Sequence, residues 1–335
     1  MDLLTQGLLG SNLALIGVKD RERLRKAALV GLLAGFAADV DFLIGSSQDP
    51  LLNLEFHRHF THSILFVPIA ALVLSIILWP LFRKSFAWCE LLLLSALGYS
   101  LSGFLDACTS YGTSLLWPLS DNRFSFNIIS IVDPVFTLLL ILGLAFSVFS
   151  RQRRAAALFL GLAAAYLALG WTQNARVEAV TARLAAELGH QPERILVRPT
   201  LGNLLLWRTL YLHDGAYYIN AVRLNPFSGE VRIFEGDRLQ RYDPSGDQSI
   251  DPGSTLGQDI RRFQRFTNDY LAQSSERPGM ISDARYANLP TSSEPLWAIQ
   301  IDPTQADDHA QYHVFRDNSS ATRGAFLDML FNRMD

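Results

Sequence analysis

The segment Phe56-His57-Arg58-His59-Phe60-Thr61-His62-Ser63 places three imidazole groups within six residues, directly before an apolar run from Ile64 to Leu81. Ionisable side chains are costly beside hydrocarbon, at about 2.5–3.5 kcal/mol per charge at the centre of a membrane helix. Histidines at such a boundary therefore indicate either polar partners or a function.

Acidic residues flank this segment at the ends of other apolar runs. Asp39-Val40-Asp41 lies upstream, and Asp106 ends an apolar run downstream. Imidazole nitrogens and carboxylate oxygens bind zinc, manganese and iron, and carboxylates can bridge two ions. We expect Asp39 and Asp41 to lie in an extended segment, where residues two apart project to the same side. The sequence therefore predicts a metal site at a membrane face.

Charge divides the chain into two parts. Residues 1–173 contain 12 Lys or Arg and 11 Asp or Glu, whereas residues 174–335 contain 17 Lys or Arg and 21 Asp or Glu. The whole chain is 49% apolar. A length of 335 residues accommodates two domains. We therefore expect an α-helical multi-pass membrane domain over 1–173, followed by a soluble α+β domain over 174–335.

Apolar runs in the first part predict its helices. Two short runs predict a helical hairpin. Each run is shorter than the roughly 20 residues of a full membrane span, so the number of times that they cross the membrane stays open. They are Leu3–Val18 and Ala27–Ala38. Four later runs approach spanning length. They are Ile64–Leu81, Phe86–Leu105, Val135–Phe149 and Ala155–Trp171.

Basic residues predict the orientation. Ten of the twelve in the first part lie in three turns, at 19–26, 83–84 and 151–154. By the positive-inside rule these turns face the cytoplasm. The opposite ends of the spans then bring five candidate ligands to the outer face: Asp39, Asp41, His57, His62 and Asp106. The site and the C-terminal domain are therefore expected to face outward, toward the periplasm in a two-membrane bacterium.

The second part changes to an alternating pattern. An amphipathic helix is expected over 174–188 and a second over 256–273, with a closing helix near 321–333. Turn residues separate segments of strand character, which predicts an antiparallel meander. The expected strands are Ile195–Pro199, Leu204–Leu212, Ala216–Leu224, Glu230–Glu235, Trp297–Ile301 and Tyr312–Phe315.

Composition also excludes some partners and chemistries. The net charge is −3 and residues 174–335 contain no Lys, which argues against nucleic acid as a partner. We find no phosphate-binding glycine loop, no G-x-S-x-G elbow and no C-x-x-C pair. Membrane lipids are the expected partners, and the substrate, a small molecule or a lipid, is not specified by the sequence.

The order of these residues resembles a known family. The pattern comprises Met1-Asp2 with Thr5, Asp39-x-Asp41, His57-Arg58-x-x-Thr61-His62-Ser63, Asp106, Tyr111-Gly112-Thr113, Pro118 and Asp133-Pro134. It resembles the membrane-bound, LexA-regulated predicted metal-dependent hydrolases of the inner membrane, closely over residues 1–150. More distantly, it is similar to zinc-dependent phospholipase C and single-strand nuclease relatives.

The resemblance implies hydrolysis of a phosphoester or a lipid-related envelope substrate by metal-activated water, with zinc or manganese as cofactor. Gln6 and Ser102 stand where the family pattern has histidine, and a carbonyl or hydroxyl oxygen is a poorer zinc ligand than imidazole. Gln6, Arg58 and Ser102 are therefore expected around the ligands. The alternative is a non-catalytic membrane protein with an eroded site, whose outer domain binds a partner.

Structural explanations compete at several of these positions. His57 and His62 could be interfacial histidines, and Asp39 and Asp41 could end the hairpin. Arg58 could equally steady a phosphate or pair with an acid. His59 is expected outside the ligand set. Asp133-Pro134 is better explained as the N-cap and first residue of the next helix.

Overall fold

The computed structural model describes residues 1–274 and 277–333 and divides the chain into two compact units. Unit 1 contains Met1–Ile44, Phe56–Trp171 and Leu201–Asn203. Unit 2 contains Gly45–Glu55, Thr172–Thr200 and Leu204–Asp335, although residues 275–276 and 334–335 of this range lie outside the described part. The helical first region and the sheet-containing second region agree with the predicted order of a helical part followed by an α+β part.

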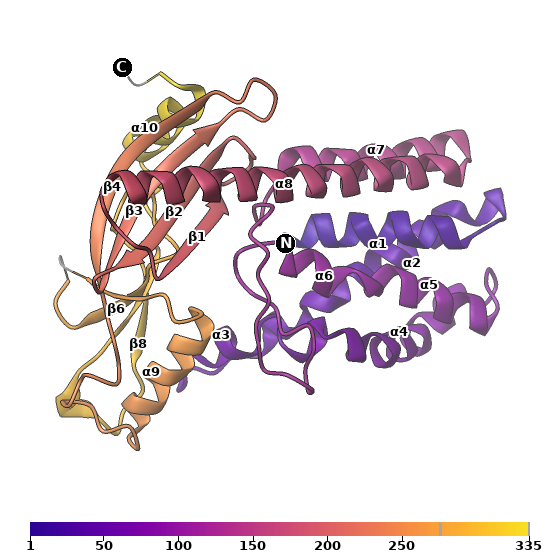
Figure 1. The fold of residues 1–335 in the computed structure, drawn as a ribbon. Coiled ribbons are helices and arrows are strands. Elements are labelled where there is room, and N and C mark those ends of the chain that lie inside the picture. Colours follow the sequence, from indigo (N-terminus) through magenta and orange to yellow (C-terminus); the bar gives the residue numbers. More distant parts are fainter. Residues whose placement is uncertain (275–276, 334–335) are drawn as a thin grey trace. The chain divides into compact units, whose positions relative to one another are not determined.

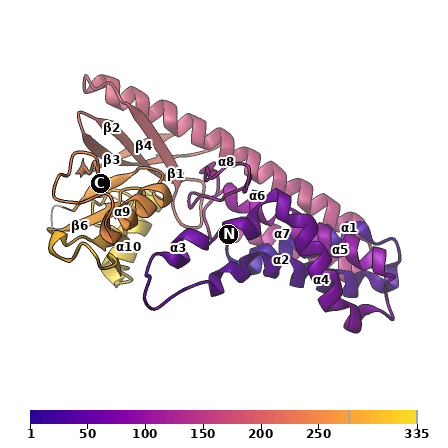
Figure 2. The same ribbon diagram turned by 90° about the horizontal axis from the view of Figure 1, so that it is seen from below.

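Unit 1 is a bundle of helices (Figures 1 and 2). Helix α1 packs against α2, α5 and α7. Stacked rings of Phe146 and Phe159, with centroids 5.8 Å apart, join α7 to α8. The helices are α1 (Leu3–Gly17), α2 (Leu24–Ala37), α4 (Val67–Phe82), α5 (Trp88–Ser100), α6 (Ser102–Ala107), α7 (Pro134–Ser150) and the part of α8 (Arg153–Glu187) that precedes Thr172.

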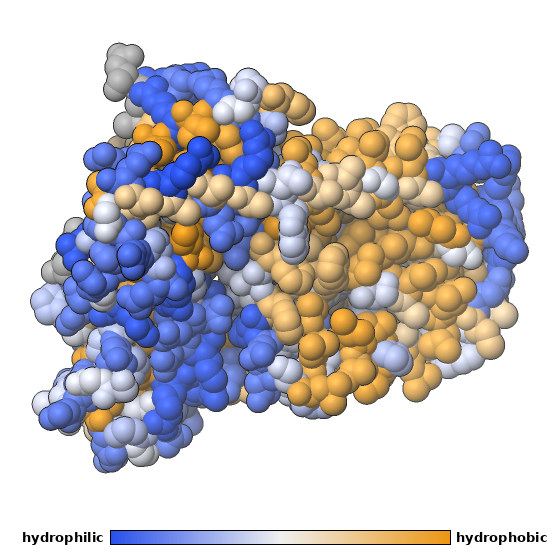
Figure 3. Space-filling view, viewed as in Figure 1, coloured by the Kyte–Doolittle hydropathy of each residue, from blue (hydrophilic) through white to orange (hydrophobic). Residues whose placement is uncertain are grey.

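Three helices in the described residues are long and apolar enough to cross a membrane. They are Ile64–Phe82, Trp88–Ala107 and Arg153–Glu187. Helix α7, with 17 residues, belongs with the shorter apolar helices, so three of the four predicted spans have full spanning length in the structure. Large apolar side chains remain exposed on these helices, and the surface of unit 1 is accordingly hydrophobic (Figure 3).

Glycines allow the helices of unit 1 to approach closely. A β-carbon at Gly10 would lie 2.3 Å from the carbonyl oxygen of Gly31 and 2.6 Å from that of Gly98. Backbone atoms of α1, α2 and α5 therefore meet where larger residues would hold them apart. Small residues at helix crossings are typical of packing in lipid, where hydrophobic exclusion cannot drive association.

Two aspartates begin helices in unit 1. Asp2 caps α1 through the backbone N–H of Thr5. Asp133 accepts hydrogen bonds from the N–H groups of Val135 and Phe136, and Pro134 is the first residue of α7. The prediction for Asp133-Pro134 is confirmed. These caps satisfy N–H groups that the helix itself leaves without partners.

The three basic turns gather at one end of unit 1. Arg23 pairs with Glu90 at 3.0 Å, Lys26 bonds Ser85 at 2.7 Å, and Arg151 pairs with Glu22 at 2.7 Å. Hydrophilic residues cover this end in Figure 3, where they border the hydrophobic surface. The candidate ligands lie at the other end of the helices.

Unit 2 contains an eight-stranded antiparallel sheet in which each strand pairs with the next along the chain. The strands are β1 (Arg194–Pro199), β2 (Leu206–His213), β3 (Ala216–Leu224), β4 (Val231–Arg241), β5 (Leu271–Gln273), β6 (Met280–Asp283), β7 (Trp297–Gln300) and β8 (Gln311–Val314). Its helices are the end of α8, most of the short α3 (Leu52–Phe56), α9 (Thr255–Phe266) and α10 (Ser320–Phe331). The meander is therefore as predicted, but longer.

Two predictions for the second region need correction. The expected helix over 256–273 ends at Phe266, because the chain turns at Asn268 and Asp269, which both have positive φ, and continues as β5. The amphipathic helix expected from residue 174 is not separate. It continues the apolar helix that begins at Arg153, since no proline lies between them and the only glycines, Gly161 and Gly170, are tolerated within the helix.

Candidate metal centre

Asp39, His62 and Asp106 converge in unit 1. The Nε2 atom of His62 lies 3.3 Å from Oδ1 of Asp39 and 3.0 Å from Oδ2 of Asp106. His62 and Asp106 are buried and Asp39 is partly exposed. One potential ligand atom from each residue lies within 4.8 Å of the others. Three residues separated by up to 67 positions in the sequence therefore present nitrogen and oxygen ligands to one point.

The spacing suits a single divalent ion. Two ligands each about 2.1 Å from a tetrahedral ion are roughly 3.4 Å apart, close to the two separations from Nε2 of His62. Among the described residues, Nε2 of His62 and Oδ2 of Asp106 are buried without a hydrogen bond, although they approach each other and charged neighbours. Buried polar atoms are normally satisfied, so these two fit a ligand role.

Asp41 contacts the histidines instead of joining this group. Its Oδ1 lies 3.1 Å from Nδ1 of His57, and its Oδ2 accepts hydrogen bonds from the N–H of Arg58 at 2.9 Å and the hydroxyl of Thr61 at 2.5 Å. The same oxygen lies 3.2 Å from Nδ1 of His62. Asp41 therefore orients the His62 ring so that Nε2 faces Asp39 and Asp106.

The prediction that Asp39 and Asp41 lie in an extended segment is wrong. Residues Ala38–Leu43 form a 3₁₀ helix directly after α2. Side chains two apart do not share a side in this conformation, which advances about 120° per residue. The two carboxylates consequently approach His62 from different directions, one at each ring nitrogen.

The backbone around the histidines is held by several polar contacts. Arg58 has a φ of 60°, a left-handed conformation at the bend before the 3₁₀ turn Phe60–His62. The Tyr99 hydroxyl donates to the carbonyl of Thr61. A β-carbon at Gly103 would lie 2.0 Å from the carbonyl oxygen of His62, so only glycine allows α6 to pack this closely.

His57 and His59 lie outside the three-residue group. The side chain of His57 is 23% exposed, with Nδ1 toward Asp41 and its ring edge-on to Tyr111 at 5.5 Å. His59 packs its ring against Phe56 and Trp117, at 5.7 and 5.4 Å. These positions place His57 beside the group and His59 in an aromatic cluster.

Arg58, Gln6 and Ser102 surround Asp106. Nε of Arg58 lies 3.0 Å from Oδ2 of Asp106, and the amide of Gln6 donates to Oδ1 at 2.9 Å. The same amide donates to the carbonyl of Ser102 at 3.3 Å. The Met1 amino group also contacts Oδ1 of Asp106. Of the two possibilities for Arg58, the structure shows pairing with an acid.

The surroundings alter the charge states of His62 and Asp41. Burial alone would lower the pKa of His62, but the carboxylates of Asp106, Asp39 and Asp41 outweigh burial and raise this pKa to about 10. Burial would raise the pKa of Asp41, but its contacts with His57, His62 and Thr61 hold that pKa well below its usual range. Asp41 is therefore an anion and, without a metal, His62 is a cation at neutral pH.

Sequence reasoning missed three supporting residues. Thr109 accepts a hydrogen bond from Nη1 of Arg58 at 2.9 Å, and Arg123 donates to the carbonyl of His57 at 3.0 Å. The third, Tyr99, holds the backbone of Thr61. Thr109 follows Asp106 by three residues, just beyond the end of α6, so its nearness to Asp106 could have been expected from the short sequence separation, whereas Arg123 lies in an irregular segment that gives no such signal.

The region that contains this centre matches a known family. The profile of the YdjM inner membrane protein family covers residues 1–177, which is more than half of the chain and includes every residue of the candidate centre. The chain belongs to the YdjM family. This membership places it among inner membrane proteins, consistent with the apolar helices of unit 1. No curated protein and no solved structure matches this YdjM family member.

Proposed function

We propose that Asp39, His62 and Asp106 bind a divalent metal ion, zinc or manganese, and that the centre hydrolyses a phosphoester of a lipid or another envelope molecule. The observation that carries the proposal is the convergence of two buried atoms without hydrogen bonds, Nε2 of His62 and Oδ2 of Asp106, at 3.0 Å. An ion held there would activate water and neutralise charge on a phosphoryl oxygen.

The residues around the centre have distinct tasks in this proposal. Asp41 fixes the tautomer and direction of the His62 ring, as carboxylates commonly do for histidine ligands. His57 is partly exposed and linked to Asp41 through Nδ1, so it can accept or release a proton beside the centre. Arg58 offsets the negative charge of Asp106.

We also propose a multi-pass arrangement in which the centre faces the periplasm. The basic turns gather at the opposite end of unit 1, and basic turns remain in the cytoplasm by the positive-inside rule. A centre on the periplasmic face would meet lipid headgroups and envelope phosphoesters more readily than cytosolic metabolites.

A specific observation supports the non-catalytic alternative. Both oxygens of Asp106 already have polar neighbours, because Arg58 lies at 3.0 Å from one and Gln6 at 2.9 Å from the other. A network of this kind can neutralise the carboxylate without a metal. In that case the centre would be structural, and unit 2 would carry the function by binding a partner.

Metal content and hydrolysis distinguish these two functions. Protein purified in neutral detergent should contain about one zinc or manganese ion per chain and should hydrolyse bis(p-nitrophenyl) phosphate. His62→Ala should lose both the ion and the activity, whereas His59→Ala should retain them. Folded protein that neither holds nor takes up metal, with no activity in any variant, would support the non-catalytic alternative.

A further inference from the structure

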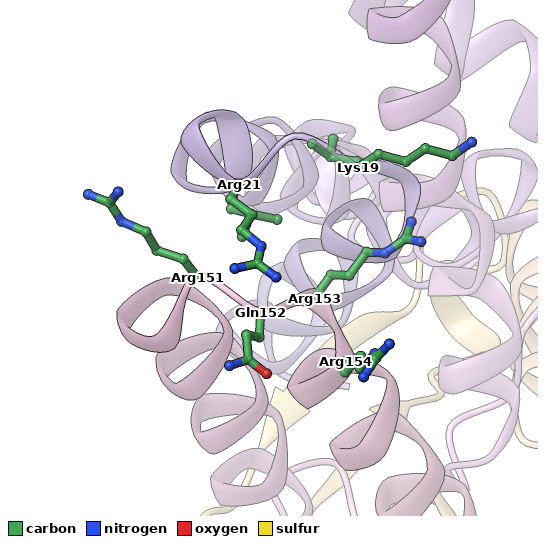
Figure 4. Close-up of a pocket in the computed structure, with 8 residues that line it drawn as sticks. Lys19, Arg21, Arg151, Gln152, Arg153 and Arg154 are labelled. Atoms are coloured by element: carbon green, nitrogen blue, oxygen red, sulfur yellow. The ribbon is translucent and has the colours of Figure 1, made fainter.

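A basic cavity lies at the end of unit 1 where the α1–α2 turn meets the α7–α8 turn. Its volume is about 250 Å³. Figure 4 shows Arg21 reaching from the first turn toward Gln152 and Arg153 of the second. The lining residues come from both turns: Val18, Lys19, Arg21, Leu24, Arg151, Gln152, Arg153 and Arg154.

Positive charge in this cavity is only partly offset. Five of the lining side chains are cationic and none is acidic. Arg151 pairs with Glu22 at 2.7 Å, but both side chains are more than 60% exposed, and such pairs contribute little. Lys19, Arg21 and Arg154 have no ion pair within 4.0 Å among the described residues. The cavity is therefore complementary to an anion.

An apolar groove is lined by residues that neighbour the cavity residues along the chain. Its volume is about 340 Å³, and Arg25 is the one charged residue that lines it. Arg25 directly follows Leu24 of the cavity, and Phe149 of the groove precedes Arg151 by two residues. The other lining residues belong to α7: Ile141, Leu144, Ala145, Val148 and Phe149.

We propose that the cavity and groove together bind one anionic glycerophospholipid. The phosphate would contact Lys19, Arg21 and Arg154, and an acyl chain would lie along α7. A free phosphate ion would use the cavity but not the groove, whereas a lipid would use both, and the neighbouring positions of the lining residues along the chain favour a lipid. Basic pockets between membrane helices on the cytoplasmic side suit such headgroups. This site uses none of the residues of the metal centre.

Binding of short-chain lipids to the full-length protein in neutral detergent tests the proposal. Dioctanoyl phosphatidylglycerol should bind at least about tenfold more tightly than dioctanoyl phosphatidylcholine, measured by native mass spectrometry. Arg21→Gln with Arg154→Gln should weaken phosphatidylglycerol binding by about thirtyfold. The matched control, Arg83→Gln with Lys84→Gln, removes two charges from an exposed turn outside the cavity and should change little.

A groove variant separates a lipid from a free anion. Ala145→Trp should fill the groove and weaken phosphatidylglycerol binding, while binding of inorganic phosphate is unchanged. Equal affinity for the two lipids, an equal loss in the control variant, or inorganic phosphate binding as tightly as phosphatidylglycerol would each overturn the proposal. If the double variant is thermally destabilised, Arg154→Gln alone replaces it, because Arg154 makes no ion pair with another described residue.

Discussion

Nε2 of His62 lies 3.0 Å from Oδ2 of Asp106, in a buried position where neither atom has a hydrogen bond among the described residues. In the metal-free centre this contact depends on a proton on Nε2, because two acceptors would repel each other. Binding of a metal would replace that proton by an ion between the same atoms. The relationship therefore links the charge of His62 to the occupancy of the centre.

Metal affinity should rise with pH. The pKa of His62 is raised to about 10. In the metal-free protein the imidazolium therefore stabilises the fold fully below the usual pKa of a histidine. This stabilisation is lost as the pH rises through about 10. A metal requires the neutral ring and displaces the proton. Between pH 6 and 9, zinc affinity should increase by up to about tenfold per unit. Titration calorimetry in buffers of different ionisation enthalpy would measure the released proton, and a pH-independent affinity would contradict this prediction.

Asp41→Asn should weaken metal binding without removing a ligand. The amide can no longer accept from both histidines and Thr61, so the His62 ring loses its fixed tautomer. Loss of such a supporting carboxylate typically costs about 10–100-fold in affinity. Competition with a chromophoric chelator would measure the change, and Asp121→Asn, in an exposed loop, is the control.

Gln6→His with Ser102→His should increase metal bound per chain. The Gln6 amide already lies 2.9 Å from Asp106, and Ser102 precedes Asp106 by one turn of α6. Imidazole is a better zinc ligand than either native side chain. Elemental analysis of purified protein measures occupancy. Unchanged occupancy in this variant, together with full occupancy in His62→Ala, would show that these positions do not form a metal site.

Gly103→Ala should disturb the centre through the backbone. The added methyl group would meet the His62 carbonyl, and forced overpacking of this kind costs about 1–3 kcal/mol. Gly161→Ala on α8 is the matched control, because no atom lies within 4 Å of the position that its methyl group would take. We expect lower thermal stability and lower metal content for the first variant only. Equal behaviour of the two variants would argue against close packing at Gly103.

Cysteine labelling should report the orientation. Cys89 is exposed and near the 83–84 basic turn, so a membrane-impermeant maleimide should leave it unlabelled in intact cells. A cysteine introduced by Asp121→Cys, in the loop between α6 and α7, should be labelled in a Cys89→Ser background. Labelling of Cys89 but not of residue 121 would reverse the proposed topology.

Sequence patterns were sufficient for the coarse architecture. Charge-poor apolar runs predicted the helices of unit 1, because burial in hydrocarbon demands long uncharged segments. Alternation and turn residues predicted strands β1 to β4. The short strands β5 and β6 were missed, since three or four residues carry too little periodicity to be distinguished from the end of helix α9.

The candidate centre was predictable as a set of residues but not as an arrangement. His62 and Asp106 lie at one end of the helices of unit 1. The basic turns predicted this, because they mark the opposite end of the same helices. The different positions of Asp39 and Asp41 depended on a six-residue 3₁₀ helix, which has no distinctive sequence signal. The pairing of Arg58 with Asp106 depended on a left-handed backbone conformation that its sequence does not predict.

The glycine contacts of unit 1 have a genetic consequence. Because Gly10, Gly31 and Gly98 meet backbone to backbone and Gly103 meets the carbonyl of His62, inactivating alleles will not be confined to residues with reactive side chains. A screen for loss of function should recover changes at these glycines alongside changes at the proposed ligands. Cellular abundance would separate the two groups, since glycine alleles deplete the folded protein and ligand alleles leave it in the membrane.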